Sequence, residues 1–238
     1  DVRRTFPFQS QPDFLFERTK ETLGLLYDMH WPHRQYATSR NVRLSPLHRT
    51  TSQLGAVMGE LAGWERPNWY AENEPAEYQY TYGKPNWFEA CQRECDAIAK
   101  HVALFDQSSY PIFHVKGPQA LSCMQHICAN NVDVAIGKIV YTQWLNADGG
   151  IEADVTVTRI ASNRFMIVSA CVSERRDWFW LRKHSARFDC AISQDEGTAI
   201  IGVMGPKSSE LLKLICDQTE RVERLGYYES ELLCAGAL

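Results

Sequence analysis

Alternating apolar and polar residues make the stretch 141–159 the clearest element of the chain. Two β-rich runs flank residues 146–150, Asn-Ala-Asp-Gly-Gly, which tolerate a positive φ and so favour a short hairpin loop. After this loop Val155 and Val157 alternate with polar residues, which is the period of a half-buried strand. The pattern therefore predicts a β-hairpin with Asp154 on the polar face of its second strand.

A strand followed by Gly-Pro and a helix occurs twice. Residues 112–118 lead into a helical pattern at 119–128, and residues 199–206 lead into another at 207–216. Glycine lets the chain turn sharply, and proline at the first helical position loses no hydrogen bond. We therefore interpret both Gly-Pro pairs as turns, not as phosphate-binding loops. Together with the strands between them, the two modules predict an α+β domain built from related β–α halves.

Three more elements are expected between these modules. Apolar residues predict a strand at 164–170, a Trp-rich amphipathic helix at 174–184 and a strand at 187–192. At the end of the chain, residues 231–235 alternate like a strand that has nothing after it to pair with.

The first part of the chain predicts one helix and a connector. Apolar residues at helical spacing predict a helix over 13–29, with Asp13 as its N-cap and Pro32 as its stop. This helix is too short to bury itself and must pack on another part of the protein. Polar residues 34–43 form the connector.

A surface loop and a second helix follow. Residues 71–85 are poor in aliphatic side chains and predict a loop or a short edge strand. Asn86 is expected to cap a helix over 87–103, because apolar residues recur there on one stripe.

Composition and charge exclude some classes of function. The chain has 238 residues, of which 45% are hydrophobic and 23% charged, as in an ordinary globular protein with a sizeable core. A net charge of −4 and a pI near 6.0 give no electrostatic reason to expect nucleic acid or a membrane as a partner. No apolar run reaches the roughly 18 residues of a membrane span, and the chain from Asp1 carries no signal-peptide pattern.

The eight cysteines show no compact spacing. No Cys-x-x-Cys pair occurs, so we interpret them as buried thiols of a protein in a reducing compartment. Cys91 and Cys95 lie one helical turn apart, with His101 downstream, but zinc requires tighter ligand clusters and no metal site is predicted.

Asp154 has two interpretations on the residues alone. A carboxylate on a strand is held rigidly, so it can polarise a basic nitrogen or act as an acid or a base if its face lines a binding site. Alternatively, Asp154 is a solvated strand residue with no role in chemistry. The hairpin pattern leaves both open.

Several motifs occur in a fixed order along the chain. They are Ser45-Pro46-Leu47, Gly63-Trp64-Glu65-Arg66-Pro67, Leu104-Phe105-Asp106-Gln107-Ser108-Ser109, Lys116-Gly117-Pro118, Tyr141 and Gly149-Gly150-Ile151-Glu152-Ala153-Asp154. Together they resemble the glycine cleavage T-protein, the tetrahydrofolate-binding aminomethyltransferase. Two further features, residues 1–43 and the variant Gly-Trp-Glu-Arg-Pro-Asn-Trp-Tyr, more closely resemble the dimethylglycine and sarcosine dehydrogenases, in which an FAD-dependent amine oxidase domain precedes a T-protein-like domain.

This resemblance implies a domain arrangement. Residues 1–43 are expected to be the C-terminal tail, or central segment, of an FAD-dependent oxidoreductase domain. Residues 44–238 are expected to be the N-terminal part of a T-protein-like α+β folate-binding domain, incomplete at its C-terminus. The chain carries no Gly-x-Gly-x-x-Gly, so FAD is expected in an absent N-terminal domain on which this part packs.

The resemblance also assigns site residues. Asp154 matches the acidic residue that contacts the reactive nitrogen region of the folate and assists one-carbon transfer, and Tyr141 matches a tyrosine of the folate site. In one hairpin register Tyr141, Gln143 and Asp154 share a face, so Gln143 joins them as a folate-binding residue. Tyr228 falls where the family has a tyrosine pair. One departure concerns Asn131, since the family usually carries Asn-Asp where this chain has two asparagines.

These expectations combine into one function. The chain is expected to be part of an FAD-dependent demethylating dehydrogenase of an N-methyl amine such as dimethylglycine or sarcosine, inactive alone, and to bind tetrahydrofolate, which accepts the one-carbon unit. Its partners are then small molecules, with neither nucleic acid nor membrane. The compartment is the cytoplasm in a bacterium and the mitochondrial matrix in a eukaryote.

Two alternatives remain open. One is a non-catalytic regulatory protein of the same architecture, like the regulatory subunit of pyruvate dehydrogenase phosphatase. The other is a stand-alone aminomethyltransferase, which residues 1–43 disfavour. Retention of Tyr141 and Asp154 favours the enzyme, because a regulator has no need of both.

Overall fold

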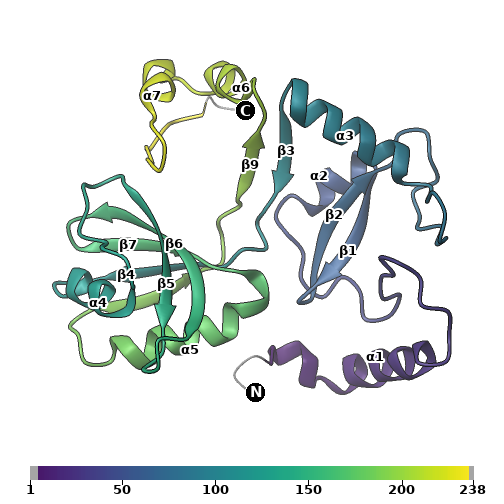
Figure 1. Ribbon diagram of the computed structural model, residues 1–238, viewed down its shortest axis with the longest axis horizontal. Coiled ribbons are helices and arrows are strands. Elements are labelled where there is room, and N and C mark those ends of the chain that lie inside the picture. Colours follow the sequence, from purple (N-terminus) through teal and green to yellow (C-terminus); the bar gives the residue numbers. More distant parts are fainter. Residues whose placement is uncertain (1–4, 236–238) are drawn as a thin grey trace. The chain divides into compact units, whose positions relative to one another are not determined.

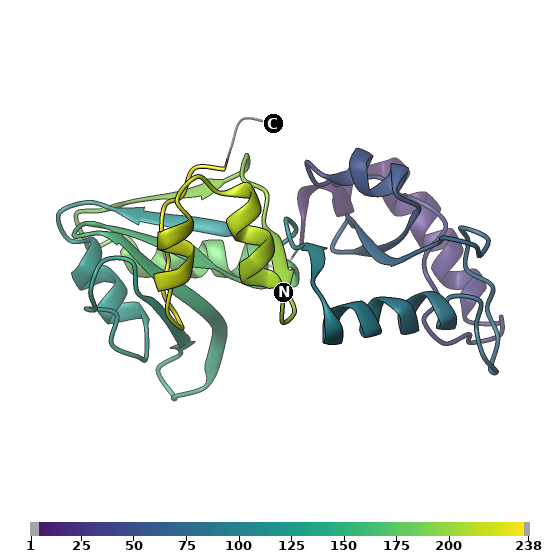
Figure 2. The same ribbon diagram turned by 90° about the horizontal axis from the view of Figure 1, so that it is seen from above.

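A computed structural model describes residues 5–235, which divide into two units. The sheet unit consists of Tyr110–Thr198 with residues 209–235, and the N-terminal unit consists of Thr5–Ser109 with Ala199–Ser208. Figures 1 and 2 show most of the N-terminal unit in purple and blue and most of the sheet unit in green and yellow. Each unit has its own strands and its own cluster of buried residues.

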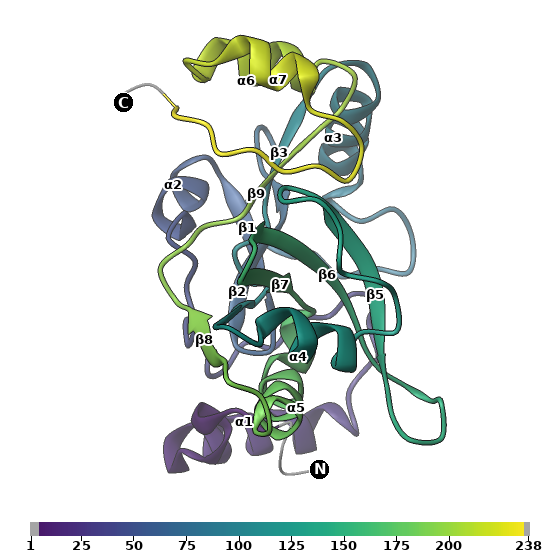
Figure 3. The same cartoon turned by 90° about the vertical axis from the view of Figure 1, so that its left-hand side faces the viewer.

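An antiparallel five-stranded sheet with the order β5-β6-β7-β4-β8 forms the frame of the sheet unit. Alternate side chains of its strands are apolar and pack with two helices, α4 and α5, which lie against each other (Figure 3). The opposite face is therefore the one that carries the polar residues of the pattern. The elements of this unit are β4 Ile112–Lys116, α4 Ala120–Ile127, β5 Ile139–Leu145, β6 Ile151–Ala161, β7 Arg164–Val168, η3 Cys171–Ser173, α5 Glu174–Ser185, β8 Ala191–Asp195, α6 Ser208–Ile215 and α7 Thr219–Arg224. The first residue of α6, Ser208, is assigned to the N-terminal unit.

The predicted hairpin is confirmed as β5 and β6. Its loop closes on the side chain of Asn146, whose Oδ1 accepts hydrogen bonds from the backbone N–H of Asp148 at 3.0 Å and of Gly150 at 2.8 Å. Gly149 has a φ of +79°, a conformation that glycine adopts without strain. The turn residues in the sequence therefore set the pairing of the two strands, with Gln143 opposite Asp154.

Two predicted strands of this unit need correction. The strand expected at 187–192 begins only at Ala191, because Asp189 and Gln119 exchange hydrogen bonds of 2.7 and 3.1 Å that hold the preceding residues against the start of α4. Residues 231–235 form no strand. Ala235 makes one isolated bridge to Cys216, and Cys234 bonds to Asp217 and Gln218 instead.

In the N-terminal unit the chain forms two small antiparallel sheets, β1 with β2 and β3 with β9. Residues 71–85 form neither helix nor strand, which agrees with the predicted loop. The elements are η2 Pro7–Ser10, α1 Pro12–Leu25, α2 His48–Gln53, β1 Ala56–Leu61, β2 Trp64–Tyr70, α3 Phe88–Lys100, β3 Ala103–Asp106 and β9 Ile201–Met204.

Both strand–Gly-Pro–helix modules are present, but they join different sheets. β4 is central in the five-stranded sheet, whereas β9 pairs only with β3. Gly117 and Gly205 have φ values of +152° and +129°, and a Cβ on either would lie within 2.7 and 2.5 Å, respectively, of a backbone oxygen. Glycine is required at both positions, which supports their interpretation as turns.

The predicted helix caps are wrong. α1 begins at Pro12 with Gln11 as N-cap, since proline suits the first helical position, and it ends at Leu25. The side chain of Asn86 does not cap α3. It accepts a hydrogen bond from Gln79 and donates one to Glu77, so it fastens the preceding loop.

Residues before 44 are held to the hairpin β1–β2 by a buried ion pair. Glu65 is 3% exposed and receives hydrogen bonds from Arg40 Nε at 2.8 Å, from Arg40 Nη2 and from the backbone N–H of Asn41 at 2.7 Å. Arg18 of α1 bonds to Glu60 of β1 at 3.0 Å. These contacts confirm that the first helix packs on another part of the protein.

Candidate functional site

Asp154 lies on the exposed face of β6, where both of its carboxylate oxygens have partners on β5. Tyr141 Oη donates to Oδ2 at 2.6 Å, and Gln143 Nε2 donates to Oδ1 at 3.0 Å. Gln143 is directly opposite Asp154 in the register, and Tyr141 is its diagonal neighbour. The structure thus brings together three of the four predicted site residues, in the register that the sequence suggested.

The Tyr141 phenol stays protonated at neutral pH. Its hydrogen bond to Asp154, followed by burial and the charge of that carboxylate, raises the pKa of Tyr141. The ring is 47% exposed, and Asp154 is exposed as well. The carboxylate is therefore oriented in advance by two donors and is still open to a ligand.

Tyr228, the fourth predicted residue, joins the same face from a distant part of the chain. The backbone N–H of Ile139 donates to Tyr228 O at 2.9 Å, and Lys138 forms a bridge with Glu229, so this segment runs antiparallel to the start of β5. Tyr228 therefore lies opposite Ile139, which shares a face with Tyr141, and the electrostatic effect of Tyr141 on the pKa of Tyr228 shows that the two phenols are neighbours. We call the exposed surface of Tyr141, Gln143, Asp154 and Tyr228 the tyrosine–aspartate face.

The backbone of Tyr228 is strained. Its φ is +53°, a value that large non-glycine residues seldom adopt. The ring lies 4.3 Å from that of Tyr227, centroid to centroid, and the hydrogen bond that Tyr228 donates to Tyr227 raises the pKa of Tyr228. The phenol of Tyr228 is therefore neutral at pH 7.

A second segment, residues 129–130, covers the rest of the outer edge of β5, and no pattern in the sequence predicted it. Asn130 N donates to Thr142 Oγ1 at 3.0 Å and its Nδ2 to Tyr141 O at 3.3 Å, while Ala129 N donates to Gln143 O at 2.9 Å. The backbone that carries Tyr141 and Gln143 is therefore fixed on both sides, by β6 and by residues 129–130.

Asn131 points away from the tyrosine–aspartate face. Its Oδ1 accepts hydrogen bonds from Gln125 Nε2 at 2.7 Å and from the backbone N–H of Asp133 at 2.9 Å. An aspartate would accept the same two bonds. The departure from the family at this position therefore leaves the site residues untouched.

For this reason Asn131→Asp is expected to change the free energy of unfolding by no more than about 0.5 kcal/mol. Asn131→Leu removes the acceptor of both hydrogen bonds and should cost about 1 kcal/mol. Urea unfolding of the two variants measures the difference. If the aspartate variant lost as much stability as the leucine variant, the two donors would not be what holds residue 131.

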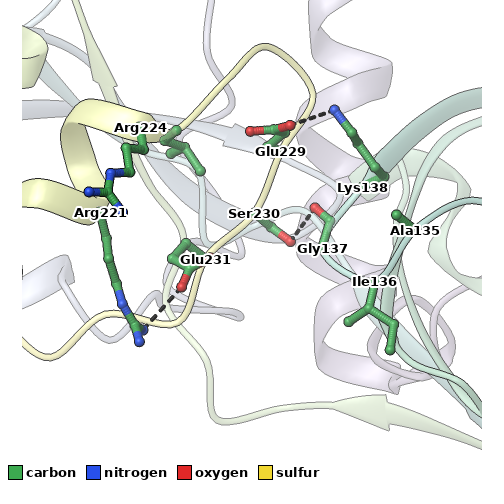
Figure 4. A pocket seen from close by; sticks show the side chains of 10 residues that line it. Ala135, Ile136, Gly137, Lys138, Arg221, Arg224, Glu229, Ser230 and Glu231 are labelled. Carbon is green, nitrogen blue, oxygen red and sulfur yellow. Dashed lines mark hydrogen bonds and ion pairs between the residues drawn. The ribbon is translucent and has the colours of Figure 1, made fainter.

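A cavity of about 430 Å³ lies beside the segment that carries Tyr228 (Figure 4). It brings three basic side chains close to two acidic ones, and the sequence pattern did not predict it, because residues after Cys216 show only a polar run. The lining residues are Ala135, Ile136, Gly137, Lys138, Arg221, Arg224, Leu225, Glu229, Ser230 and Glu231.

The cysteines and histidines of residues 5–235 form no metal site. No group of three or more His, Cys, Asp or Glu side chains in this part of the chain could hold a metal ion, and none of its cysteines forms a disulfide. Burial raises the pKa of Cys123 and of Cys128 to about 12. The prediction of buried thiols is wrong for Cys95 and Cys234, which are exposed.

Among the described residues, no helix has the length and the apolar character needed to cross a bilayer.

Two family models match the chain. The GCVT N-terminal domain matches residues 47–235, and the FAD dependent oxidoreductase central domain matches residues 1–45. The change from one model to the other falls within the Ser45-Pro46-Leu47 motif, just before α2 begins at His48.

Curated relatives include oxidoreductases and a regulatory protein. The chain is 44% identical over 98% of its length to a 4-methylaminobutanoate oxidase (formaldehyde-forming) of Paenarthrobacter nicotinovorans, 30% identical over 89% to the mitochondrial pyruvate dehydrogenase phosphatase regulatory subunit of Mus musculus, and 26% identical over 99% to the mitochondrial sarcosine dehydrogenase of Homo sapiens. It spans 28%, 25% and 30% of these proteins.

A solved structure shares the fold. The glycine cleavage system aminomethyltransferase T of Bartonella henselae superposes with a TM-score of 0.62 at 26% identity, covering 72% of this chain and 43% of that protein. The predicted α+β, T-protein-like fold is confirmed.

Proposed function

Because the chain belongs to the family of GCVT N-terminal domains, with a piece of an FAD dependent oxidoreductase central domain before it, we propose that it binds tetrahydrofolate in a demethylating oxidoreductase of N-methyl amines. In this function the tyrosine–aspartate face holds the folate while it accepts the one-carbon unit that amine oxidation releases. The oxidase and dehydrogenase names of the relatives support this class of reaction.

The observation that carries the proposal is the orientation of Asp154. A carboxylate has about four acceptor sites, so the bonds from Tyr141 and Gln143 leave room for an N–H of a ligand. The exposed rings of Tyr141 and Tyr228 lie on the same side and offer flat surfaces to an aromatic ring system. A carboxylate beside tyrosine rings thus fits a molecule that is flat and carries ring nitrogens.

Each residue then has a separate role. Tetrahydrofolate, when bound, supplies the nitrogens that take up a one-carbon unit. Asp154 accepts a hydrogen bond from the reacting nitrogen and takes its proton at Oδ1 or Oδ2. Tyr141 and Gln143 hold the carboxylate in position, and Tyr228 packs on the ring.

We further propose that residues 1–43 belong to the oxidoreductase domain and residues 44–238 to the folate domain. The chain has no Gly-x-Gly-x-x-Gly, so FAD would be held by residues outside it. Helix α1 exposes Phe16, Leu23 and neighbouring apolar side chains, which suit a contact with the FAD domain. For the compartment we propose the cytoplasm if the protein is bacterial and the mitochondrial matrix if it is eukaryotic, since two of the relatives are mitochondrial.

The test compares products with and without folate. Purified protein of native length should release formaldehyde from an N-methyl amine in the absence of tetrahydrofolate, and methylene-tetrahydrofolate in its presence. An assay for free formaldehyde alongside one for the amine consumed measures the split. If saturating tetrahydrofolate left the formaldehyde yield unchanged, the folate role would be wrong. A purely regulatory protein would consume no amine at all.

A further inference from the structure

Two cysteines of the sheet unit meet where the start of α4 is held against the residues before β8. Gln119 and Asp189 exchange hydrogen bonds of 2.7 and 3.1 Å. Gly117 lies so close to the same segment that a Cβ on it would be 2.7 Å from Cα of Cys190 and 3.1 Å from its Cβ. Cys123 N donates to Gln119 O at 2.9 Å, which places Cys123 one turn into the helix. The backbone thus brings the two cysteines to the same place.

The side chains of the two cysteines are in contact. Cys123 is completely buried, whereas Cys190 is half-buried and packs against the same apolar cluster. Burial, followed by the charge of Cys190 and the hydrogen bond between the two thiols, raises the pKa of Cys123 to about 12. Cys123 therefore stays protonated at neutral pH and donates to the sulfur of Cys190. Cys190 is the thiol of the pair that a small reagent can reach.

This contact differs from the arrangement of Cys91 and Cys95, which lie one turn apart on α3. Cβ atoms at that spacing on a helix are about 5–6 Å apart, beyond the roughly 3.5–4.5 Å of a disulfide. The pair at α4 and the segment before β8 has no such restriction, because its members come from two different segments. The positive charge of Arg187 also acts on Cys123 and favours a thiolate there.

From this contact we propose that Cys123 and Cys190 are a modification site, at which a hydroperoxide oxidises the two thiols to a disulfide that ties α4 to the segment before β8. Both cysteines are thiols in the structure, which is the state expected in a reducing compartment. The inference is independent of the folate function, since it concerns the apolar side of the sheet where α4 packs.

The chemistry balances with one molecule of hydrogen peroxide. The thiolate of Cys190 attacks a peroxide oxygen, the O–O bond breaks and hydroxide leaves, so Cys190 becomes a sulfenic acid. The sulfur of Cys123 then attacks that of Cys190, and the S–O bond breaks as the disulfide forms. The two protons of the thiols and the two hydroxide ions end as two molecules of water, and the two sulfurs lose two electrons to the peroxide. Because the sulfurs are already in contact, the second step should outpace further oxidation of Cys190.

Peptide mapping after peroxide treatment tests the proposal. Reduced protein of native length is treated with hydrogen peroxide, its free thiols are alkylated, and the digest is analysed by mass spectrometry. The main oxidised product should be a linked Cys123–Cys190 peptide pair, lighter by two hydrogen atoms than its two parts, and dithiothreitol should separate it. The proposal is overturned if Cys190 is recovered as a sulfinic acid, joined to another cysteine, or still alkylated.

Thermal unfolding provides a second measurement. The disulfide closes a long loop, so oxidation should raise the melting temperature of the parent by about 5–10 °C. Cys190→Ser should abolish both the linked peptide and this rise. Cys95→Ser, which alters an exposed cysteine of α3, should keep both. No rise in the oxidised parent, or an equal rise in Cys190→Ser, would show that these two cysteines do not tie α4 to the segment before β8.

Discussion

Asp154→Asn is expected to lower the rate of one-carbon transfer to tetrahydrofolate about 10²- to 10³-fold, the usual effect of losing one preorganised charged partner. The substitution keeps the shape of the side chain but removes the negative charge that faces the reacting nitrogen. In the proposed function amine oxidation takes place outside this chain, so it should be nearly unchanged. The product should therefore shift from methylene-tetrahydrofolate to formaldehyde at a similar rate of amine consumption.

Two comparisons make this result specific. Asp148→Asn alters an exposed aspartate at the tip of the same hairpin and should not change the product ratio. Tyr141→Ala should shift the products in the same direction through weaker binding, so excess folate should restore part of the transfer, whereas it should not rescue Asp154→Asn. Normal transfer in the Asp154→Asn variant would make Asp154 an ordinary polar strand residue.

The second large effect concerns stability. Arg40→Met should cost about 3–5 kcal/mol of unfolding free energy, because it leaves the carboxylate of Glu65 buried without its partner. The double variant with Glu65→Met should recover much of that loss, since two apolar side chains can replace a buried ion pair. Arg34→Ala breaks an exposed pair with Asp28 and should cost less than about 1 kcal/mol.

Acid should weaken the ion pair of Arg40 with Glu65. Burial alone would raise the pKa of Glu65, but the hydrogen bonds from Arg40 and Asn41 and the charge of Arg40 hold it below its usual value. A lowered carboxyl pKa adds stability above the unfolded value, about 4.3, and that stability is lost as the pH falls through the folded value. Urea unfolding from pH 7 to 3 should show the gap between parent and Arg40→Met closing below about pH 4. A gap constant over that range would mean that Glu65 is not stabilised by its charge.

Local patterns predicted the hairpin and the face that Tyr141, Gln143 and Asp154 share, because the signals there are short in range. The alternation around Val155 and the turn residues 146–150 determine which side chains face solvent and which residues pair. Gln143 and Asp154 are only 11 residues apart, so a hairpin register suffices to bring them together.

Contacts between distant segments could not be obtained in this way. Lys138 and Glu229 are 91 residues apart, and nothing in the polar run before Tyr227 indicates that it returns to β5. The predicted N-cap of α3 was wrong for a related reason. Asparagine is a favourable N-cap residue, but the side-chain amide of Asn86 forms its hydrogen bonds with residues of the loop 71–85 instead of with the first turn of α3.

The separation of these contacts along the chain has a consequence for the order in which the protein folds. The β5–β6 hairpin closes a short loop, and pairings of this kind form within microseconds. Tyr228 must find Ile139 across most of the sheet unit, and long-range pairings are slow. Asp154 thus acquires its two donors, Tyr141 and Gln143, early in folding, whereas the ring of Tyr228 reaches this face late. The tyrosine–aspartate face is complete only when the segment that carries Tyr228 has docked on the start of β5.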